Sequence, residues 1–425
     1  MTVIGAKRSG SAAAQLLRAR GADVQLMDVQ PETPDVIVQS EENLLRSAPD
    51  LVVISPGVPY DLPMLESTRA RGVPVIGEVE LAGYFLKGPV IGITGSNGKT
   101  TTTALTGHVL KACGVACQIG GNIGTAVTSI VDSSRDDQWN VLELSSFQLE
   151  TISTFRAKIA ACLNVTPDHL DRHHTFENYA AAKRRLFETQ QWDDHAVLNR
   201  DDATCRSYAQ TTLGEVTWFS LRERLLPGVS LAGDELCWYG KPFMSRSQIR
   251  LRGLHNVENV ACAAAMAHLA GAPLDQIGAA VESFPGVEHR IEFVRNLNGV
   301  DYFNDSKATN VDATLKAIDA FPNGLWIILG GKDKGSDYSP LIEPLQQRAK
   351  AALLIGAAAP LIRTALDAKV PLVDCGTLDR AVGYAYDRSE PGDTVLLAPA
   401  CASFDQFKNY EERGSTFKRL VQGLF

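Results

Sequence analysis

Residues 90–101 read VIGITGSNGKTT, and this stretch indicates how the middle of the chain folds. Its first four residues are an apolar run that predicts a buried β-strand, and residues 104–110 have the composition of a helix. The intervening G-x-x-G-K-T loop points backbone N–H groups and a helix N-terminus at one place, which favours a multiply charged phosphate. Lys99 is expected to reach the β- and γ-phosphates, and the Thr100 hydroxyl is expected to hold Mg²⁺. The stretch therefore predicts an ATP site.

Polar side chains follow the next strands along the chain. Glu143 ends an apolar run and is either a metal ligand beside the phosphate loop or an ordinary glutamate at the end of a strand. His169 lies just after the strand at residues 159–163 and is the better candidate for a metal or substrate contact, whereas His173 and His174 are interpreted as solvated loop residues. Lys183, in a helical segment, is interpreted from pattern alone as a solvated surface charge.

Composition excludes several classes of protein. The 425 residues are 45% hydrophobic and 21% charged, which is typical of a globular chain of two to four domains. The net charge is −8 and no basic stripe is present, so we expect no nucleic-acid partner. No apolar run approaches the ~20 residues of a membrane span, so no membrane partner is expected. The eight cysteines form no zinc pattern, which favours reduced thiols in a cytoplasmic protein.

Alternating strand and helix patterns predict an α/β protein with three domains in series, at residues 1–87, 88–286 and 287–425. The first and last are predicted to be Rossmann-like, and the central one to be a P-loop ATPase-like domain with a parallel sheet. Residues 218–249 switch to short strands and turns, which we interpret as an antiparallel excursion.

Three further groups are candidates for ligand contacts. Asn256 and Asn259 are three residues apart and share a helix face, either as caps or as amides for a bound base or phosphate. Arg290 could reach a phosphate or form a structural ion pair. Polar clusters also follow the strands that end near residues 303, 329 and 397, and ligands bind beyond the carboxyl ends of parallel strands.

Taken together, these stretches resemble the Mur ligases, the ATP-dependent amide-forming enzymes of peptidoglycan precursor synthesis. The resemblance is carried by GSNGKTT at 95–101, LELSSFQLE at 142–150, NDSKATN at 304–310 and CASFDQF at 401–407, in the family's order over essentially the whole chain. Ile93, at the first glycine position of the longer phosphate-loop pattern, is normal in this family. The resemblance implies ATP and Mg²⁺ as cofactors, UDP-N-acetylmuramoyl-L-alanine and D-glutamate as substrates, and a monomer.

The resemblance also implies roles for individual residues. The ATP-binding positions are Gly95, Ser96, Asn97, Gly98, Lys99, Thr100, Thr101, Asn256, Asn259, Arg290 and Asp305. The magnesium ligands are Thr100, Glu143, His169 and Lys183, the last as a carbamate, and Lys99, His169 and Lys183 are the catalytic set. Glutamate is expected at Lys307, Thr309, Lys334, Ser403 and Phe404, and the UDP-sugar at Arg8, Ser9, Asp28, Asn122 and Ser145.

One turn departs from the family pattern. Lys7 stands in the first βα turn where many relatives carry a glycine that lets the backbone approach a pyrophosphate. Arg8 and Ser9 could compensate by contacting the UDP phosphates directly, and Asp28 could contact the uridine.

Two rival functions remain open at this level. A folylpolyglutamate-synthase-like ligase shares the phosphate loop but lacks the first Rossmann-like block. A P-loop switch or transport ATPase gives no reason for the clusters around Lys307, Lys334 and Ser403. The ligase interpretation further expects the strand ends of separate domains to converge on one cleft.

Overall fold

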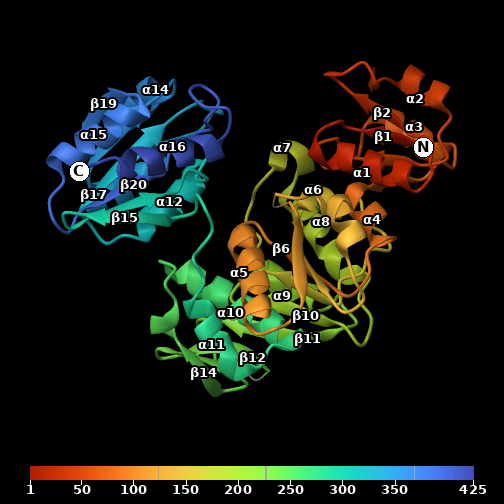
Figure 1. The fold of residues 1–425 in the computed structure, drawn as a ribbon, viewed down its shortest axis with the longest axis horizontal. Helices are drawn as coiled ribbons and strands as arrows, with labels where there is room; N and C mark the ends of the chain where they lie inside the picture. The colour runs from red at the N-terminus through yellow and green to blue at the C-terminus, as the bar shows by residue number, and fades with distance from the viewer. Residues whose placement is uncertain (123, 225–226, 368) are drawn as a thin grey trace. The chain divides into compact units, whose positions relative to one another are not determined.

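A computed structural model describes residues 1–122, 124–224, 227–367 and 369–425. The chain divides into two compact units, one of residues 1–250 with 255–284 and the other of residues 251–254 with 285–425. The first unit holds two sheets and the second holds one, and all three are built mainly from parallel strands (Figure 1). The α/β fold class is thereby confirmed. In the part of the chain that the structure describes, no helix is long and apolar enough to cross a membrane.

The N-terminal sheet is parallel and doubly wound. Its strand order is β3-β2-β1-β4-β5. Val3 packs on one face against helix residues such as Leu17, and Ile4 packs on the other against Leu44 and Leu65, as the two-residue period of a strand requires. The elements are β1 (Thr2–Ile4), α1 (Arg8–Ala19), β2 (Gln25–Asp28), β3 (Val36–Val38), α2 (Glu41–Ser47), β4 (Val52–Ile54), α3 (Pro63–Ala70), β5 (Val75–Gly77) and α4 (Glu78–Gly83).

Helix α4 joins this sheet to the central one. Its Glu78 carboxylate accepts hydrogen bonds from the Thr128 backbone N–H and hydroxyl, at 2.6 and 2.8 Å. Glu80 accepts from the backbone N–H groups of Ser153, Thr154 and Phe155. Because both carboxylates are buried and bonded to the central part of the chain, the two sheets form one compact unit.

The central sheet has the order β14-β13-β12-β11-β10-β9-β6-β8-β7. Its strands are β6 (Val90–Thr94), β7 (Cys117–Gly121), β8 (Trp139–Glu143), β9 (Ile159–Cys162), β10 (His195–Asn199), β11 (Glu215–Ser220), β12 (Gly228–Ala232), β13 (Glu235–Trp238) and β14 (Lys241–Ser245). The strand β6 lies between β8 and β9 and is parallel to both. The chain therefore reverses its direction across the sheet at β6, which is where open α/β sheets bind ligands.

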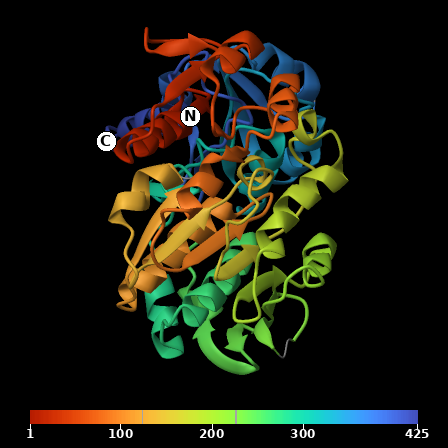
Figure 2. The ribbon, with the colours of Figure 1, turned by 90° about the vertical axis from the view of Figure 1, so that its right-hand side faces the viewer.

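Helices cover both faces of the central sheet (Figures 1 and 2). They are α5 (Lys99–Ala112), α6 (Ser146–Leu149), α7 (Leu170–His173), α8 (Phe176–Glu188), α9 (Ala203–Tyr208), α10 (Leu254–Leu269) and α11 (Leu274–Glu282). Leu186 and Phe187 of α8 pack in one core cluster with Leu142 and with Val79 of α4.

The predicted antiparallel excursion at residues 218–249 is only partly correct. β11 and β12 pair in parallel, and the antiparallel pairing begins between β12 and β13 and continues to β14. Short strands joined by turns give the same sequence pattern in either direction, because direction depends on the route of the connection and not on strand composition.

The second unit contains one six-stranded sheet of order β15-β16-β20-β17-β18-β19, in which only β15 and β16 pair antiparallel. Its strands are β15 (Glu292–Leu297), β16 (Val300–Asn304), β17 (Leu325–Gly330), β18 (Ala349–Ile355), β19 (Leu372–Gly376) and β20 (Thr394–Leu397). Its helices are α12 (Val311–Asp319), α13 (Ile342–Arg348), α14 (Ala359–Leu366), α15 (Leu378–Arg388) and α16 (Tyr410–Gln422). Helices α12–α14 cover one face, and α15 and α16 cover the other.

Candidate active site

The phosphate loop lies between β6 and α5, as predicted. Gly98 is the residue before α5 and has a φ of 85°, and a Cβ atom there would lie 2.3 Å from the Asn259 side-chain oxygen, so only glycine fits. Asn164, after β9, fixes the other side of the loop, because its carbonyl accepts from the Ser96 N–H and its side chain accepts from the Asn97 N–H. Thr100 and Thr101 lie in the first turn of α5. Two asparagines outside the loop, Asn164 and Asn259, thus lie directly against it.

Two lysines converge on one carbonyl of this loop. The ammonium groups of Lys99 and Lys183 each lie 2.8 Å from the Gly95 oxygen, and Lys99 also donates to the Ser96 oxygen. Lys183 is 1% exposed, so its interpretation as a solvated surface charge is wrong. Burial, aided by the neighbouring charge of Lys99, lowers the pKa of Lys183 to about 7. A large share of Lys183 is therefore a neutral amine near neutral pH.

Glu143 offers a carboxylate beside the loop. It ends β8 opposite Ile93 of β6, and one of its oxygens accepts from the Asn122 amide at 2.8 Å. The side chain is 2% exposed, and its other oxygen is buried with no hydrogen-bond partner among the residues described. An isolated buried carboxylate oxygen is costly unless a cation or donor binds it. This oxygen, with the Thr100 hydroxyl in the adjacent turn, fits the oxygen ligands that Mg²⁺ prefers.

The loop after β9 places His169 among aromatic side chains, one of which reaches the phosphate loop. His169 precedes α7 with a φ of 52°, and its ring lies 4.8 Å from that of Phe147 and 6.5 Å from that of Tyr179. The Tyr179 hydroxyl in turn lies 2.9 Å from the Ser96 hydroxyl of the phosphate loop. His169 is half exposed and can receive a ligand.

The interpretation of His173 as a solvated residue is wrong, whereas His174 is exposed as predicted. The His173 side chain is 4% exposed and lies 3.0 Å from the Ser146 hydroxyl. His173 and His174 have the same sequence surroundings. Their burial differs because His173 packs against α6 and His174, among the residues described, does not.

Asn256 and Asn259 do share a face of α10. Both are buried, and the Asn259 amide donates to the Asn256 side-chain oxygen at 3.0 Å. Asn259 also accepts from the Thr102 hydroxyl of α5 at 3.2 Å. Asn259 thus joins α10 to α5 just behind the phosphate loop, and its role toward a bound ligand stays a prediction.

The sequence-predicted UDP-sugar residues line one cavity. The cavity has a volume of about 570 Å³ and is lined by the loops after β1, β2 and β4 together with residues of the central part, among them Lys7, Arg8, Ser9, Asp28, Asn122 and Gln148. Ser145 is attached to its wall, because its backbone N–H and hydroxyl donate to the Gln148 side chain. The pKa of the Asp28 carboxyl is lowered, mainly by the Gln30 N–H. The volume lies within the range of small-molecule sites.

In the second unit, the three polar loops meet at one edge of the sheet. β20 lies between β16 and β17, and backbone hydrogen bonds join Ala400 to Ala308 and Ala402 to Lys332. The loops that carry the predicted glutamate residues therefore lie side by side. Of these residues, Ser403 is buried, Lys307 and Thr309 are half-buried, and Lys334 and Phe404 are exposed.

Asp305 and Arg290 interact at the same edge. Asp305 follows β16, and burial raises the pKa of its carboxyl to about 7 although the positive charge of Arg290 opposes that shift. The carboxyl can therefore donate or accept a proton near neutral pH.

Sequence reasoning missed two residues of α16. The Lys307 ammonium lies 3.9 Å from the centre of the Tyr410 ring. Arg413 is 1% exposed and donates to the Ser306 and Cys401 carbonyls at 2.8 and 3.2 Å. A tyrosine and an arginine near the start of an amphipathic helix carry no pattern that distinguishes them from surface residues, so only tertiary packing reveals their place.

Comparisons with known proteins identify the family to which the chain is similar. Residues 93–267 match the family described as Mur ligase middle domain, and residues 289–401 match the Mur ligase, glutamate ligase domain. The UDP-N-acetylmuramoylalanine--D-glutamate ligase of Solibacter usitatus is 61% identical, over 99% of this chain and 97% of that protein. The protein of the same name from Acidobacterium capsulatum is 50% identical, over 99% of this chain and 95% of its own length.

Solved structures share the fold at lower identity. The UDP-N-acetylmuramate-alanine ligase of Thermotoga maritima has a TM-score of 0.63 at 19% identity, covering 99% of this chain and 98% of that one. A pseudomurein peptide ligase type C from Methanothermus fervidus has a TM-score of 0.62 at 17% identity, covering 99% of both chains.

Proposed function

The chain belongs to the Mur ligase family, and from this premise we propose that it joins D-glutamate to UDP-N-acetylmuramoyl-L-alanine in peptidoglycan precursor synthesis, with ATP converted to ADP and phosphate. The two full-length relatives at 61% and 50% identity carry this activity in their names. The observation that carries the proposal is the pair of lysines, Lys99 and Lys183, which both donate to the Gly95 carbonyl of a phosphate loop. We further propose that the enzyme acts in the cytoplasm as a monomer, and the free state of all eight cysteines supports a reducing compartment.

The first step activates a carboxylate. The alanine carboxylate is a poor acylating agent, because its leaving group would be oxide. One of its oxygens attacks the γ-phosphorus of ATP, and the bond from that phosphorus to the bridging oxygen of the β-phosphate breaks. ADP departs, and the product is an acyl phosphate. The N–H groups of the phosphate loop and the Lys99 ammonium neutralise charge on the transferred group. When bound through Thr100 and Glu143, and through His169 and a modified Lys183, Mg²⁺ supplies further charge neutralisation.

Lys183 has the chemistry to become a carbamate. Its neutral amine, available because the pKa is about 7, adds to dissolved carbon dioxide and releases one proton, which leaves an N-carboxylate. That change replaces a buried cation next to Lys99 by an anion, so it removes a repulsion and creates an attraction. The new oxygens are suitable metal ligands, which the ammonium is not.

The second step forms the amide. The deprotonated amine of D-glutamate attacks the acyl carbon, and the tetrahedral intermediate expels phosphate. We assign the glutamate carboxylates to Lys307, Lys334, Thr309 and Ser403, on loops that the second unit holds side by side. Phe404 is exposed beside Ser403 and is assigned to the same pocket. Arg290, Asp305, Asn256 and Asn259 are assigned to ATP on the family resemblance.

The UDP-sugar is assigned to the cavity of about 570 Å³ in the first unit. Arg8 and Lys7 lie there with Asp28, so cationic groups for the diphosphate and an acceptor for the uracil N–H are both present. Lys7 thus supplies charge where relatives rely on a glycine. The five-stranded N-terminal sheet that builds this cavity counts against the folylpolyglutamate-synthase-like alternative.

The test is ADP release by the full chain with ATP, Mg²⁺ and UDP-N-acetylmuramoyl-L-alanine, and with D-glutamate, L-glutamate, L-alanine or no amino acid. We expect release that depends on both substrates and is largest with D-glutamate. Lys99→Ala is the matched control and is expected to abolish it. ADP release that is independent of the UDP-sugar and the amino acid would contradict the proposal and favour a simple ATPase.

A further inference from the structure

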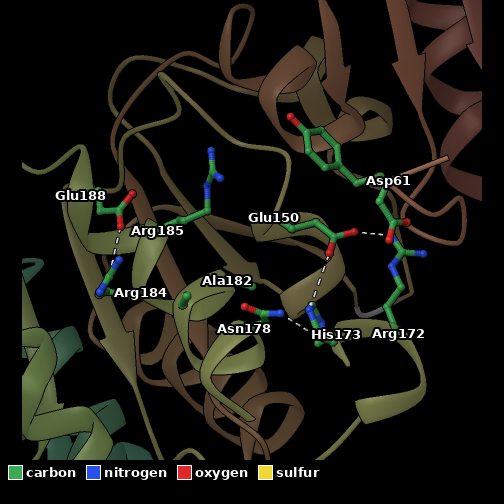
Figure 3. Close-up of a pocket in the computed structure, with 11 residues that line it drawn as sticks. Asp61, Glu150, Arg172, His173, Asn178, Ala182, Arg184, Arg185 and Glu188 are labelled. Carbon is green, nitrogen blue, oxygen red and sulfur yellow. Dashed lines mark hydrogen bonds and ion pairs between the residues drawn. The ribbon is translucent and has the colours of Figure 1, made fainter. Parts of the chain in front are cut away.

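A second cavity in the first unit is lined by a largely shielded ion pair that the proposed mechanism does not use. It has a volume of about 460 Å³ and lies between the loop at Tyr60 and Asp61 and the helices α6, α7 and α8 (Figure 3). Arg172 and Glu150 form an ion pair at its wall, and their side chains are only 13% and 15% exposed. Burial raises the pKa of Glu150 although Arg172 opposes the shift. A pair that is so well shielded from water interacts more strongly than a surface pair.

Arg172 contacts two segments outside its own helix, the turn after β4 and the helix α6 with its C-cap residue Glu150. Besides Glu150, its guanidinium donates to the Val58 carbonyl at 2.8 Å, and its central carbon lies 5.0 Å from the centre of the Phe147 ring. A planar guanidinium can donate in two directions and stack at the same time, whereas a lysine ammonium cannot reproduce this set of contacts.

The first of these segments forms the wall of the proposed UDP-sugar cavity. Val58 lies in the turn after β4, where its N–H donates to the Ser55 carbonyl, and residues 55–59 line the cavity of about 570 Å³ together with Arg8 and Asp28. A ligand that orders the turn at residues 55–59 therefore also fixes the position of the Val58 carbonyl, which accepts a hydrogen bond from Arg172.

The other segment, α6, positions His169. Phe147 lies under Arg172 and packs against the His169 ring, with 4.8 Å between ring centres. His169 and Arg172 lie at the two ends of one helical turn, and His173 fastens that turn to α6 through the Ser146 hydroxyl. A movement of Arg172 therefore moves the backbone that carries His169.

We propose that Arg172 is a positioning residue that couples occupancy of the UDP-sugar cavity to the placement of His169 at the phosphate loop. This inference rests on the proposed function. Coupling between two sites is reciprocal, so a nucleotide bound at the phosphate loop must tighten the UDP-sugar by the same factor by which the UDP-sugar tightens the nucleotide.

The test measures that factor by calorimetry. The dissociation constant of UDP-N-acetylmuramoyl-L-alanine is determined with and without Mg²⁺ and a non-hydrolysable ATP analogue. We expect the two constants to differ at least about 5-fold in the unmodified protein and to become equal in Arg172→Lys and Arg172→Ala. Turnover should fall about 10-fold in Arg172→Lys, as for residues that orient a ligand of a metal.

The matched control is Arg184→Ala. Arg184 lines the same cavity, but it is half exposed, and its ion pair among the residues that the structure describes is with Glu188 on its own helix, at 3.2 Å. In this variant we expect the nucleotide to change the dissociation constant of the UDP-sugar by the same factor as in the unmodified protein. Arg172→Lys retains charge and most of the volume, so it remains informative if Arg172→Ala does not fold.

The inference is overturned if Arg172→Lys keeps the factor, if Arg184→Ala loses it equally, or if the unmodified protein shows none. Failure of the proposed function looks different, because the unmodified protein would then not form the amide from the named substrates at all.

Discussion

Each compact unit buries a cationic side chain at the carboxyl edge of its sheet, and the two side chains differ in their hydrogen-bond acceptors and in their pKa values. In the first unit, Lys183 donates to one carbonyl and faces a second cation, Lys99, so its pKa falls to about 7. In the second unit, Arg413 donates five hydrogen bonds to carbonyl and hydroxyl oxygens, and burial lowers its pKa only to about 10. Lys183 can therefore lose its proton and react as a neutral amine. Arg413 stays charged and connects two loops through hydrogen bonds.

Burial alone therefore does not indicate function. Arg413 connects the Ser306 loop to the loop at Cys401 and Ala402 without an ion-pair partner among the side chains described, and backbone carbonyls with the Ser306 hydroxyl accept its hydrogen bonds. Lys183 lacks such a set of acceptors, and its site becomes favourable only when the amine loses its charge or becomes a carbamate.

The largest expected effect is on stability, from Arg413→Met. This change leaves the Ser306 and Cys401 carbonyls without their donor, whereas Ala402 keeps the Lys332 N–H, and buried unsatisfied groups cost about 1–3 kcal/mol each. We expect the free energy of unfolding of the second unit to fall by about 4 kcal/mol in urea titrations. Arg419→Met, at an exposed position of the same helix, is the control and should cost under about 0.5 kcal/mol. Equal losses would show that Arg413 is not a link.

The next effect is on activity, from Lys183→Ala. We expect turnover to fall about 100-fold, at the upper end of the losses caused by altered metal surroundings. Acetate or formate at millimolar concentration should restore part of it, because a small carboxylate can replace the carbamate oxygens. The same additives should not restore Arg413→Met. Full activity of untreated Lys183→Ala would remove the carbamate from the mechanism.

A smaller effect is expected in the pH dependence of stability. Between pH 7 and about 10.5 the unfolded chain keeps the Lys183 proton that the folded chain has released, so stability rises with pH in this window. Below pH 7 both states are protonated and this contribution no longer changes. In buffer free of carbon dioxide, the unmodified chain should gain about 1 kcal/mol relative to Lys183→Met between pH 7 and 8. Parallel stability curves for the two proteins would contradict the lowered pKa.

The smallest effect is expected from Asp28→Asn in the UDP-sugar cavity. The carboxylate accepts from the Ala6 and Gln30 N–H groups, and an amide keeps one acceptor but loses the charge. We expect KM for the UDP-sugar to rise about 5-fold, corresponding to about 1 kcal/mol, with kcat and KM for ATP unchanged. A matching rise in KM for ATP would place Asp28 outside the UDP-sugar site.

The sequence predicts the parts of this molecule that depend on local pattern. The phosphate loop, the strands that precede it and Glu143, and the α/β class follow from apolar runs and glycine spacing, and the structure confirms them. The resemblance implies a metal-ligand role for Lys183, but the composition of its helix is that of a solvated one and does not predict that the side chain is buried.

The parts that the sequence does not reveal depend on contacts between distant segments. The burial of His173, the parallel pairing of β11 with β12, and the contacts of Tyr410 and Arg413 are set by packing between residues that are far apart in the chain. Arg172 reaches Val58 across 114 positions, and no local period carries that information.

The most direct test of the central claim follows the oxygen atoms of the acceptor carboxylate. UDP-N-acetylmuramoyl-L-alanine labelled with ¹⁸O in both alanine carboxylate oxygens is converted with ATP and D-glutamate, and the released phosphate is analysed by mass spectrometry. An acyl phosphate transfers one labelled oxygen to each phosphate and leaves the other in the amide, and this is the result we predict. Unlabelled phosphate released together with the amide product would contradict activation of the carboxylate by phosphoryl transfer.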